Sequence, residues 1–297
     1  MARRHPILRG MLISAGVALA LVVLMVGVAA VLGGGLGDRF SLGKSIGLLE
    51  LEGVITDAAD AIETLDRFRK QESTVAVVLR IDSPGGAVAP SQELYDAVWR
   101  LREAGKPVVA SLGNVAASGG YYVASAAKTI FADPGTITGS IGAIMSVRQL
   151  TDLAQKVGVS EQVVKSGPFK DAGNPLRPLS PEERALFQEM VDDVLTQFVM
   201  AVAKGREMSE TEVRPLADGR IYSGAAAHRV GLVDRLGGLT EAVDAAWREA
   251  GQEGEPRVSR VRGRRRAWWL ELLGQFIPEP AGMTGGLFYL YQGPLLE

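Results

Sequence analysis

Short continuous apolar runs alternate along the chain with longer segments that have helical spacing. Such runs are typical of strands buried on both faces of a sheet. They are found at 46–55, 75–81 and 107–113, with two shorter runs at 129–134 and 162–167. Segments 57–70 and 91–104 place apolar residues three or four positions apart, as an amphipathic helix does. The order β-α-β-α-β predicts the α/β class, with a mainly parallel sheet flanked by helices.

A longer amphipathic helix is predicted from Pro181 to Arg206. Its start is marked by Ser180, a preferred N-cap residue, which is followed by a proline and two acids. Two shorter helices are expected at about 223–230 and 239–250. Together with the sheet they define one domain at residues 45–250.

An uncharged apolar run occupies residues 11–32. As a helix it is about 33 Å long, which is enough to cross the core of a bilayer. Because three arginines precede it, we expect a cytoplasmic N-terminus (1–10), a transmembrane anchor (11–32), a linker (33–44) and an extracytoplasmic domain, as in a single-pass protein of the cell membrane. The alternative is a cleavable signal peptide, whose apolar region is usually shorter, about 7–15 residues.

Charge is distributed unevenly, although the net charge is only −2. Residues 1–37 contribute +3, 256–266 contribute +6 and 267–297 contribute −3, which leaves −8 for residues 38–255. So acidic a body argues against a nucleic-acid partner. The chain has no cysteine and only two histidines, which excludes disulfides, thiolate metal sites and a cysteine nucleophile. We expect neither a metal nor a cofactor.

Two glycine-rich segments, Gly85-Gly86 and Ser118-Gly119-Gly120, come directly after predicted buried strands. Ligands of an open α/β sheet bind at this edge, and glycines leave backbone N–H groups uncovered for a developing oxyanion. The second segment also opens a helix, whose positive end would favour a reactive hydroxyl at Ser118. The alternative is that Ser118 is only an N-cap and that the glycines only permit tight turns.

A serine nucleophile needs a base, and histidine offers little choice. His5 lies beyond the predicted anchor, His228 lies in a predicted surface helix, and no G-x-S-x-G segment occurs. Lysine is the remaining candidate. Lys170 stands out because it lies in a loop rich in glycine and proline, 166–175, although an ordinary solvated lysine is the alternative there.

Five segments, taken in their order along the chain, indicate a known protein family. They are IDSPGG (81–86), GNVAASGGYY (113–122), TGSIGAI (138–144), SGPFKDAGNP (166–175) and ADGRIYSGAAAHRVGLVDRLGG (217–238). Together they resemble the single-domain, membrane-anchored form of the signal peptide peptidase A family. The resemblance covers about residues 45–250, and the same segments occur in the same order in that family.

The resemblance implies a crotonase- and Clp-protease-like fold and a serine peptidase with a Ser/Lys dyad. It assigns Ser118 as the nucleophile and Lys170 as the general base. Ser140 matches the hydroxyl that positions the lysine, and the N–H groups of Gly85 and Gly119 match the oxyanion hole. The implied substrates are hydrophobic peptides, such as signal peptides left after secretion.

A lysine base places demands on its surroundings. An ordinary lysine has a pKa near ~10.4, so the base must lie in an apolar, water-poor site to be neutral. Asp171 would favour the ammonium form if it faced Lys170, so we expect its carboxylate to point away. In double-length members of the family the serine and lysine lie in different halves. By analogy we expect a homo-oligomeric ring, in which Lys170 of one protomer meets Ser118 of its neighbour.

The tail at 251–297 combines six arginines with the apolar segment AWWLELLGQFI (267–277). This combination is typical of a helix that lies on anionic membrane lipid. The alternatives are an element packed on a neighbouring protomer and a disordered tail.

Two other functions remain open for the whole chain. One is an acyl-CoA-binding enzyme of the same fold, and the other is a non-catalytic membrane-anchored scaffold.

Overall fold

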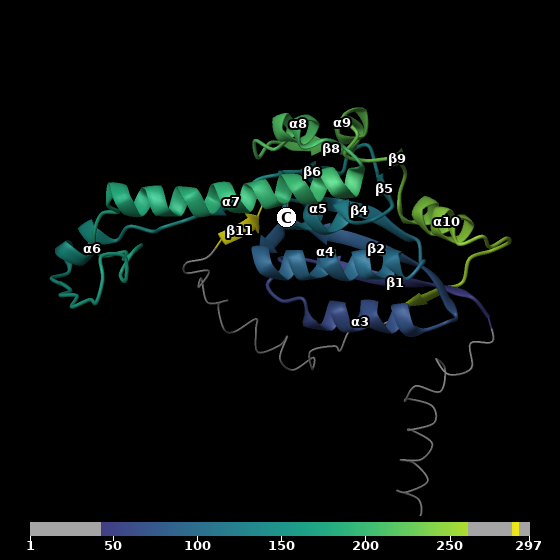
Figure 1. Cartoon of the computed structure of the whole chain (residues 1–297), viewed down its shortest axis with the longest axis horizontal. Helices are drawn as coiled ribbons and strands as arrows, with labels where there is room; N and C mark the ends of the chain where they lie inside the picture. The colour runs from purple at the N-terminus through teal and green to yellow at the C-terminus, as the bar shows by residue number, and fades with distance from the viewer. Residues whose placement is uncertain (1–42, 261–286, 291–297) are drawn as a thin grey trace, which may run out of the picture. The chain divides into compact units, whose positions relative to one another are not determined.

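The computed structural model of the protein describes residues 43–260 and 287–290 (Figure 1). The chain divides into two units, 1–44 and 45–297, and the second contains the predicted domain. The expected anchor at 11–32 and most of the tail lie outside the described residues. Within the described ranges, no helix has both the length and the apolar character needed to cross a membrane.

A parallel sheet forms the centre of this unit, with the strand order β10-β1-β2-β4-β5-β9 (Figure 1). Its strands are β1 (Ser45–Glu52), β2 (Thr74–Ser83), β4 (Val108–Ala117), β5 (Thr129–Ala132), β9 (Arg235–Leu236) and β10 (Val258–Arg260). The first part of β4 pairs with β5, and its last residues pair in parallel with β6 (Ile137–Gly139). β6 in turn pairs antiparallel with β8 (Ile221–Ser223). The sheet confirms the predicted α/β class.

The central strands are buried on both faces, as their continuous apolar composition predicts. Val77 and Leu79 of β2 pack in one apolar cluster with α3 (Ala59–Lys70), α4 (Val88–Glu103) and α5 (Gly119–Ser125). The alternate residues Ala76 and Val78 pack in a second cluster with α10 (Leu239–Glu249). Helices therefore cover both faces of the sheet.

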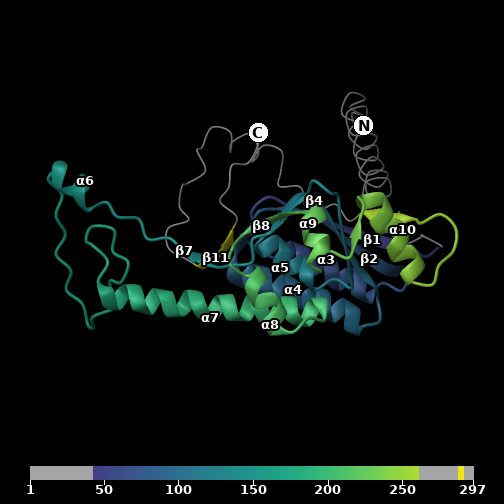
Figure 2. The same ribbon diagram turned by 90° about the horizontal axis from the view of Figure 1, so that it is seen from above.

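Helix α7 (Pro181–Arg206) has the predicted bounds and two unlike halves. Apart from Glu183, its buried residues begin at Val194, and from there on it packs on α5. The first half reaches away from the sheet, toward α6 (Thr151–Lys156) and the loop between the two helices (Figure 2). We call residues 146–180 together with the first half of α7 the arm.

A second, three-stranded sheet lies beside α4 and α5. It consists of β3 (Gly85–Ala87), β11 (Leu287–Leu290) and β7 (Ile144–Met145), in that order. β11 is antiparallel to both neighbours, and its Leu290 is paired with Gly85. A segment from the end of the chain therefore lies between two strands from its first half.

The expected strand at 162–167 is wrong, because these residues form no strand and are exposed. The side chain of Val164 is fully exposed, so no neighbouring strand or helix covers the run. The two shorter helices are present as α9 (Gly224–Arg229) and α10, and a further short helix, α8 (Glu210–Val213), follows α7.

Candidate active site

Ser118 occupies a strained position at the junction of β4 and α5. It is the N-cap residue of α5, with φ 53° and ψ −117°, a backbone region that residues other than glycine rarely adopt. Its N–H donates to the carbonyl oxygen of Gly139 at 2.8 Å, and its own carbonyl accepts from Tyr122 at 2.8 Å. Backbone hydrogen bonds on both sides thus hold the strained conformation.

Ser140 lies beside Ser118 because the strands that precede them are in register. Ala117 of β4 is paired in parallel with Gly139 of β6, so the next residue of each strand is a serine at the same sheet edge. Ser140 also has a positive φ, 50°, and its N–H donates to the carbonyl oxygen of Arg220 at 2.9 Å. Both serines are buried in the single chain.

The two glycines expected to supply backbone donors lie at the same edge. Gly119 is the first residue of α5, so its N–H has no acceptor within the helix. Gly85 opens β3, which is in contact with α5. The Gly85 N–H donates to Ser83 Oγ at 3.1 Å in this structure. Gly120 permits the close approach, since a Cβ there would lie 2.8 Å from the Ser83 carbonyl oxygen.

Lys170 is not brought to this edge within one chain. It is exposed in the loop that precedes α7, and its N–H donates to the carbonyl oxygen of Gly167 at 3.3 Å. Apart from Glu183, the buried residues of α7 begin at Val194, and the rise from Glu183 to Val194 is roughly 16 Å. The arm therefore holds Lys170 well away from the helix that begins at Ser118.

His228 lies in α9, as expected for a surface helix, and it is exposed. Its Nδ1 lies 3.0 Å from the carbonyl oxygen of Val233. In the part of the chain that the structure describes, no three histidine, aspartate or glutamate side chains gather as a metal site would require.

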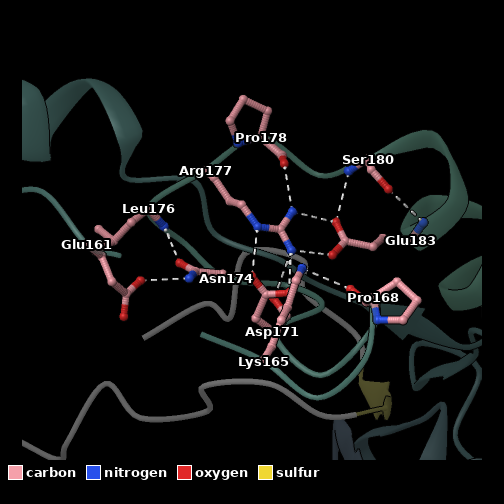
Figure 3. Close-up of polar contacts among 10 residues, drawn as sticks. All are labelled: Glu161, Lys165, Pro168, Asp171, Asn174, Leu176, Arg177, Pro178, Ser180 and Glu183. Atoms are coloured by element: carbon pink, nitrogen blue, oxygen red, sulfur yellow. Dashed lines mark hydrogen bonds and ion pairs between the residues drawn. The ribbon is translucent and has the colours of Figure 1, made fainter. Parts of the chain in front are cut away.

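Four charged residues around the Lys170 loop form an ion cluster that the sequence reasoning missed (Figure 3). They are Lys165, Asp171, Arg177 and Glu183, and we call them the loop ion cluster. Lys165 Nζ lies 2.5 Å from Asp171 Oδ1, and Arg177 Nε lies 3.1 Å from Asp171 Oδ2. Arg177 Nη1 lies 2.8 Å from Glu183 Oε2, and its Nη2 also bonds Glu183.

These contacts change the acidity of both carboxyl groups. Hydrogen bonds from Arg177 and then from Lys165 lower the pKa of Asp171 to about 2. Hydrogen bonds from Arg177 and from the Ser180 N–H lower the pKa of Glu183 to about 2. Three of its residues lie in a loop and only Glu183 lies in a helix, so no periodic pattern within one element could have revealed the cluster.

The model of peptidase family S49 matches residues 100–253. A protein of Synechocystis sp. named "Putative protease slr0021" is 45% identical over 200 residues, which cover 67% of this chain and 72% of that one.

More distant relatives carry related names. Serine protease SPPA, chloroplastic, from Arabidopsis thaliana, is 36% identical over 71% of this chain and 31% of its own length. Protease 4 of Haemophilus influenzae is 32% identical over 74% of this chain and 37% of its own length. The chain thus spans well under two thirds of these two longer relatives.

Proposed function

Since the chain belongs to peptidase family S49 and is a serine peptidase, we propose that it uses a Ser118/Lys170 dyad and is anchored in the cell membrane. The observation that carries this proposal is the strained, buried position of Ser118 at a helix start, beside Ser140 and two glycines. The substrates proposed are hydrophobic peptides, such as signal peptides that remain after secretion.

The proposed reaction begins with attack of Ser118 Oγ on a peptide carbonyl carbon. Lys170 Nζ, in its neutral form, takes the hydroxyl proton and later gives it to the leaving amine. The oxyanion is stabilised by the N–H groups of Gly119 and Gly85, the latter exchanging its Ser83 acceptor for the substrate oxygen. Water then hydrolyses the acyl-enzyme, with Lys170 as the base, and Ser140 holds the amine in place.

The lysine would come from a neighbouring protomer in a homo-oligomeric ring. Two observations support this: Lys170 is exposed in the single chain, and the arm that carries it has an apolar surface that is exposed among the residues the structure describes. The exposed apolar residues of the arm are Val147, Leu150, Leu153, Val157, Val159, Val163, Val164, Phe169 and Met190. Burial of this surface against a second copy would also supply the dry surroundings that a neutral lysine needs.

The three-stranded sheet supports a peptide as the substrate. Between β3 and β7 the chain already accommodates one extended segment, β11, antiparallel to both. A peptide that replaced β11 would pair its backbone with β3 at Gly85, beside the proposed oxyanion hole. The arrangement of a parallel sheet with such an edge also agrees with the proposed crotonase- and Clp-protease-like fold.

Membrane anchoring rests on the sequence of residues 11–32. With the positive-inside bias it places the peptidase domain on the extracytoplasmic face, where released signal peptides are generated. The basic and apolar tail would add contacts with anionic lipid on the same face.

The dyad is tested by peptide hydrolysis with the detergent-solubilised full chain. Ser118→Ala and Lys170→Ala are each expected to lower kcat/KM by about 1,000-fold or more. Ser125→Ala is the matched control, because Ser125 is a buried serine of the same helix whose hydroxyl donates to the Tyr122 carbonyl oxygen. Full activity of Ser118→Ala would overturn the proposal.

The shared site is tested by mixing the two inactive variants under conditions where protomers exchange. In a ring each mixed interface can pair an intact Ser118 with an intact Lys170, so about a quarter of the sites should be active in an equal mixture. Recovery of activity supports the shared site. A mixture that stays inactive although mass spectrometry shows mixed rings contradicts it.

A further inference from the structure

The loop ion cluster surrounds the proposed base in the sequence and ties its loop to α7 (Figure 3). Asp171 is the residue directly after Lys170, and its side chain is only 12% exposed. Lys165 and Arg177 both contact its carboxylate, and Arg177 Nη2 also donates to the Asp171 carbonyl oxygen at 3.1 Å. Side chain and backbone of the residue next to Lys170 are therefore fixed by the same guanidinium.

The other side of Arg177 is attached to a rigid element. Its two Nη atoms bond the two carboxylate oxygens of Glu183, whose side chain is 3% exposed. Glu183 also accepts from the Ser180 N–H at 2.9 Å, while Ser180 Oγ accepts from the Glu183 N–H at 3.2 Å. This capping box fixes Glu183 in the first turn of α7. Arg177 thus connects the Lys170 loop to a helix that is anchored in the body.

Charge balance has a further effect on the base. An uncompensated carboxylate beside an amine favours the charged ammonium form. Asp171 faces two cations, and Glu183 shares one of them, so the four charges of the cluster cancel. Glu161 is a further charged group close to this loop, and it accepts from the Asn174 side chain at 2.7 Å. The residues of α6 that line the adjoining pocket are uncharged: Thr151, Ala154 and Gln155.

We propose that Arg177 is a positioning residue for Lys170, which fixes the lysine loop on α7 and holds the Asp171 carboxylate away from the amine. This inference rests on the proposed function. It assigns no contact with substrate to Arg177. Lys165 contacts the same carboxylate through Oδ1 alone, whereas Arg177 contacts both oxygens. The Lys165 ammonium also bonds the Pro168 carbonyl oxygen at 3.0 Å.

The test is the pH dependence of kcat/KM for the full chain and three variants. Arg177→Gln leaves the cluster with one excess negative charge and should move the midpoint of the acid limb upward by about 0.5–1 pH unit. Asp171→Asn leaves one excess positive charge and should move the midpoint downward. The double variant restores the charge balance and should return the midpoint toward that of the parent, even if its rate stays low.

A purely structural role would lower the rates of all three variants without opposite shifts of the acid limb. Unshifted midpoints, or shifts in the same direction, overturn the inference. Arg67→Gln is the matched control, since Arg67 forms an exposed ion pair with Glu63 on α3, and its midpoint should not move. Should Arg177→Gln fail to fold because Glu183 loses its partner, Lys165→Gln replaces it and should also shift the midpoint upward.

Failure of the inference is distinct from failure of the proposed function. If Ser118→Ala and Lys170→Ala abolish hydrolysis while the cluster variants leave the acid limb unchanged, the dyad stands and the role of Arg177 is wrong. If Lys170→Ala retains full activity, the dyad itself is wrong.

Discussion

At the scale of single residues, the backbone of Ser118 is the most constrained feature of the site. A serine with φ 53° and ψ −117° costs about 1–3 kcal/mol relative to a relaxed residue. The rest of the fold offsets this strain, because hydrogen bonds with Gly139 and Tyr122 hold the residue on both sides. In this conformation the side chain of the N-cap residue forms no cap hydrogen bond with the helix start.

The strain can be measured by comparing two inactive variants. Ser118→Ala keeps a Cβ in the strained region, whereas Ser118→Gly removes it. We expect Ser118→Gly to be more stable than Ser118→Ala by about 1 kcal/mol, or roughly 2–4 °C in Tm, by calorimetry. Elsewhere glycine usually destabilises relative to alanine, so equal or reversed stabilities would contradict the strain.

Several residues at this sheet edge could be named from the sequence alone. Ser118, Ser140, Gly85 and Gly119 were all named from motifs, and the register of β4 with β6 explains why Ser118 and Ser140, 22 positions apart, lie side by side. It missed Arg177 and Glu183, because an ion cluster depends on how a loop folds back on a helix. The hydrogen bond from the Gly85 N–H to Ser83 Oγ also could not be predicted from the sequence.

At the scale of elements, the packing of α7 on α5 depends on one glycine. A Cβ at Gly205 would lie 1.9 Å from the carbonyl oxygen of Ser125, at the end of α5. The second half of α7 adds Phe198, whose ring lies 4.9 Å from that of Tyr122. The helix that begins at Ser118 is therefore held from behind by the helix that carries the arm.

Gly205→Ala tests this contact. In an unconstrained helix the change would stabilise by up to about 1 kcal/mol. Here we expect a loss of about 2–3 kcal/mol, or roughly 5–10 °C in Tm, because backbone must move. Gly135→Ala is the control, since a Cβ there meets nothing within 4 Å. Equal Tm values for the two variants would show that the contact is not as close as described.

Regular elements were predictable where the apolar pattern was long. The bounds of α7 were predicted to the residue, since its N-cap signal is complete, and the four central strands were found within a few residues. The expected strand at 162–167 was wrong because a short apolar run does not reveal whether a neighbour covers it. β3, β7 and β11 are too short to show a period, and their pairing joins distant parts of the chain.

At the scale of the whole molecule, β11 occupies the place that we propose for the substrate. Its backbone pairs with β3 at Gly85 and with β7, so a bound peptide and β11 would compete for the same hydrogen bonds. The chain would then limit its own access to peptides.

Truncation tests this competition. Deletion of residues 287–297 is expected to raise kcat/KM for a short peptide several-fold, mainly through a lower KM, because the edge of β3 is freed. Deletion of 291–297 alone retains β11 and serves as the control, with activity close to that of the full chain. Indistinguishable kinetics of the two truncated proteins would show that β11 does not compete with substrate.

The single helix α7 also sets a limit on changes of chain length. Each residue of an α-helix adds about 100° of rotation and 1.5 Å of rise, and before Val194 only Glu183 of α7 is buried. One inserted residue between 184 and 193 would turn the lysine toward a different neighbour in any assembly. About seven inserted residues would restore the direction of the lysine, but the longer helix would hold it farther from the body. Residues 184–193 should therefore tolerate insertions poorly, although most of their side chains are exposed and should tolerate substitution.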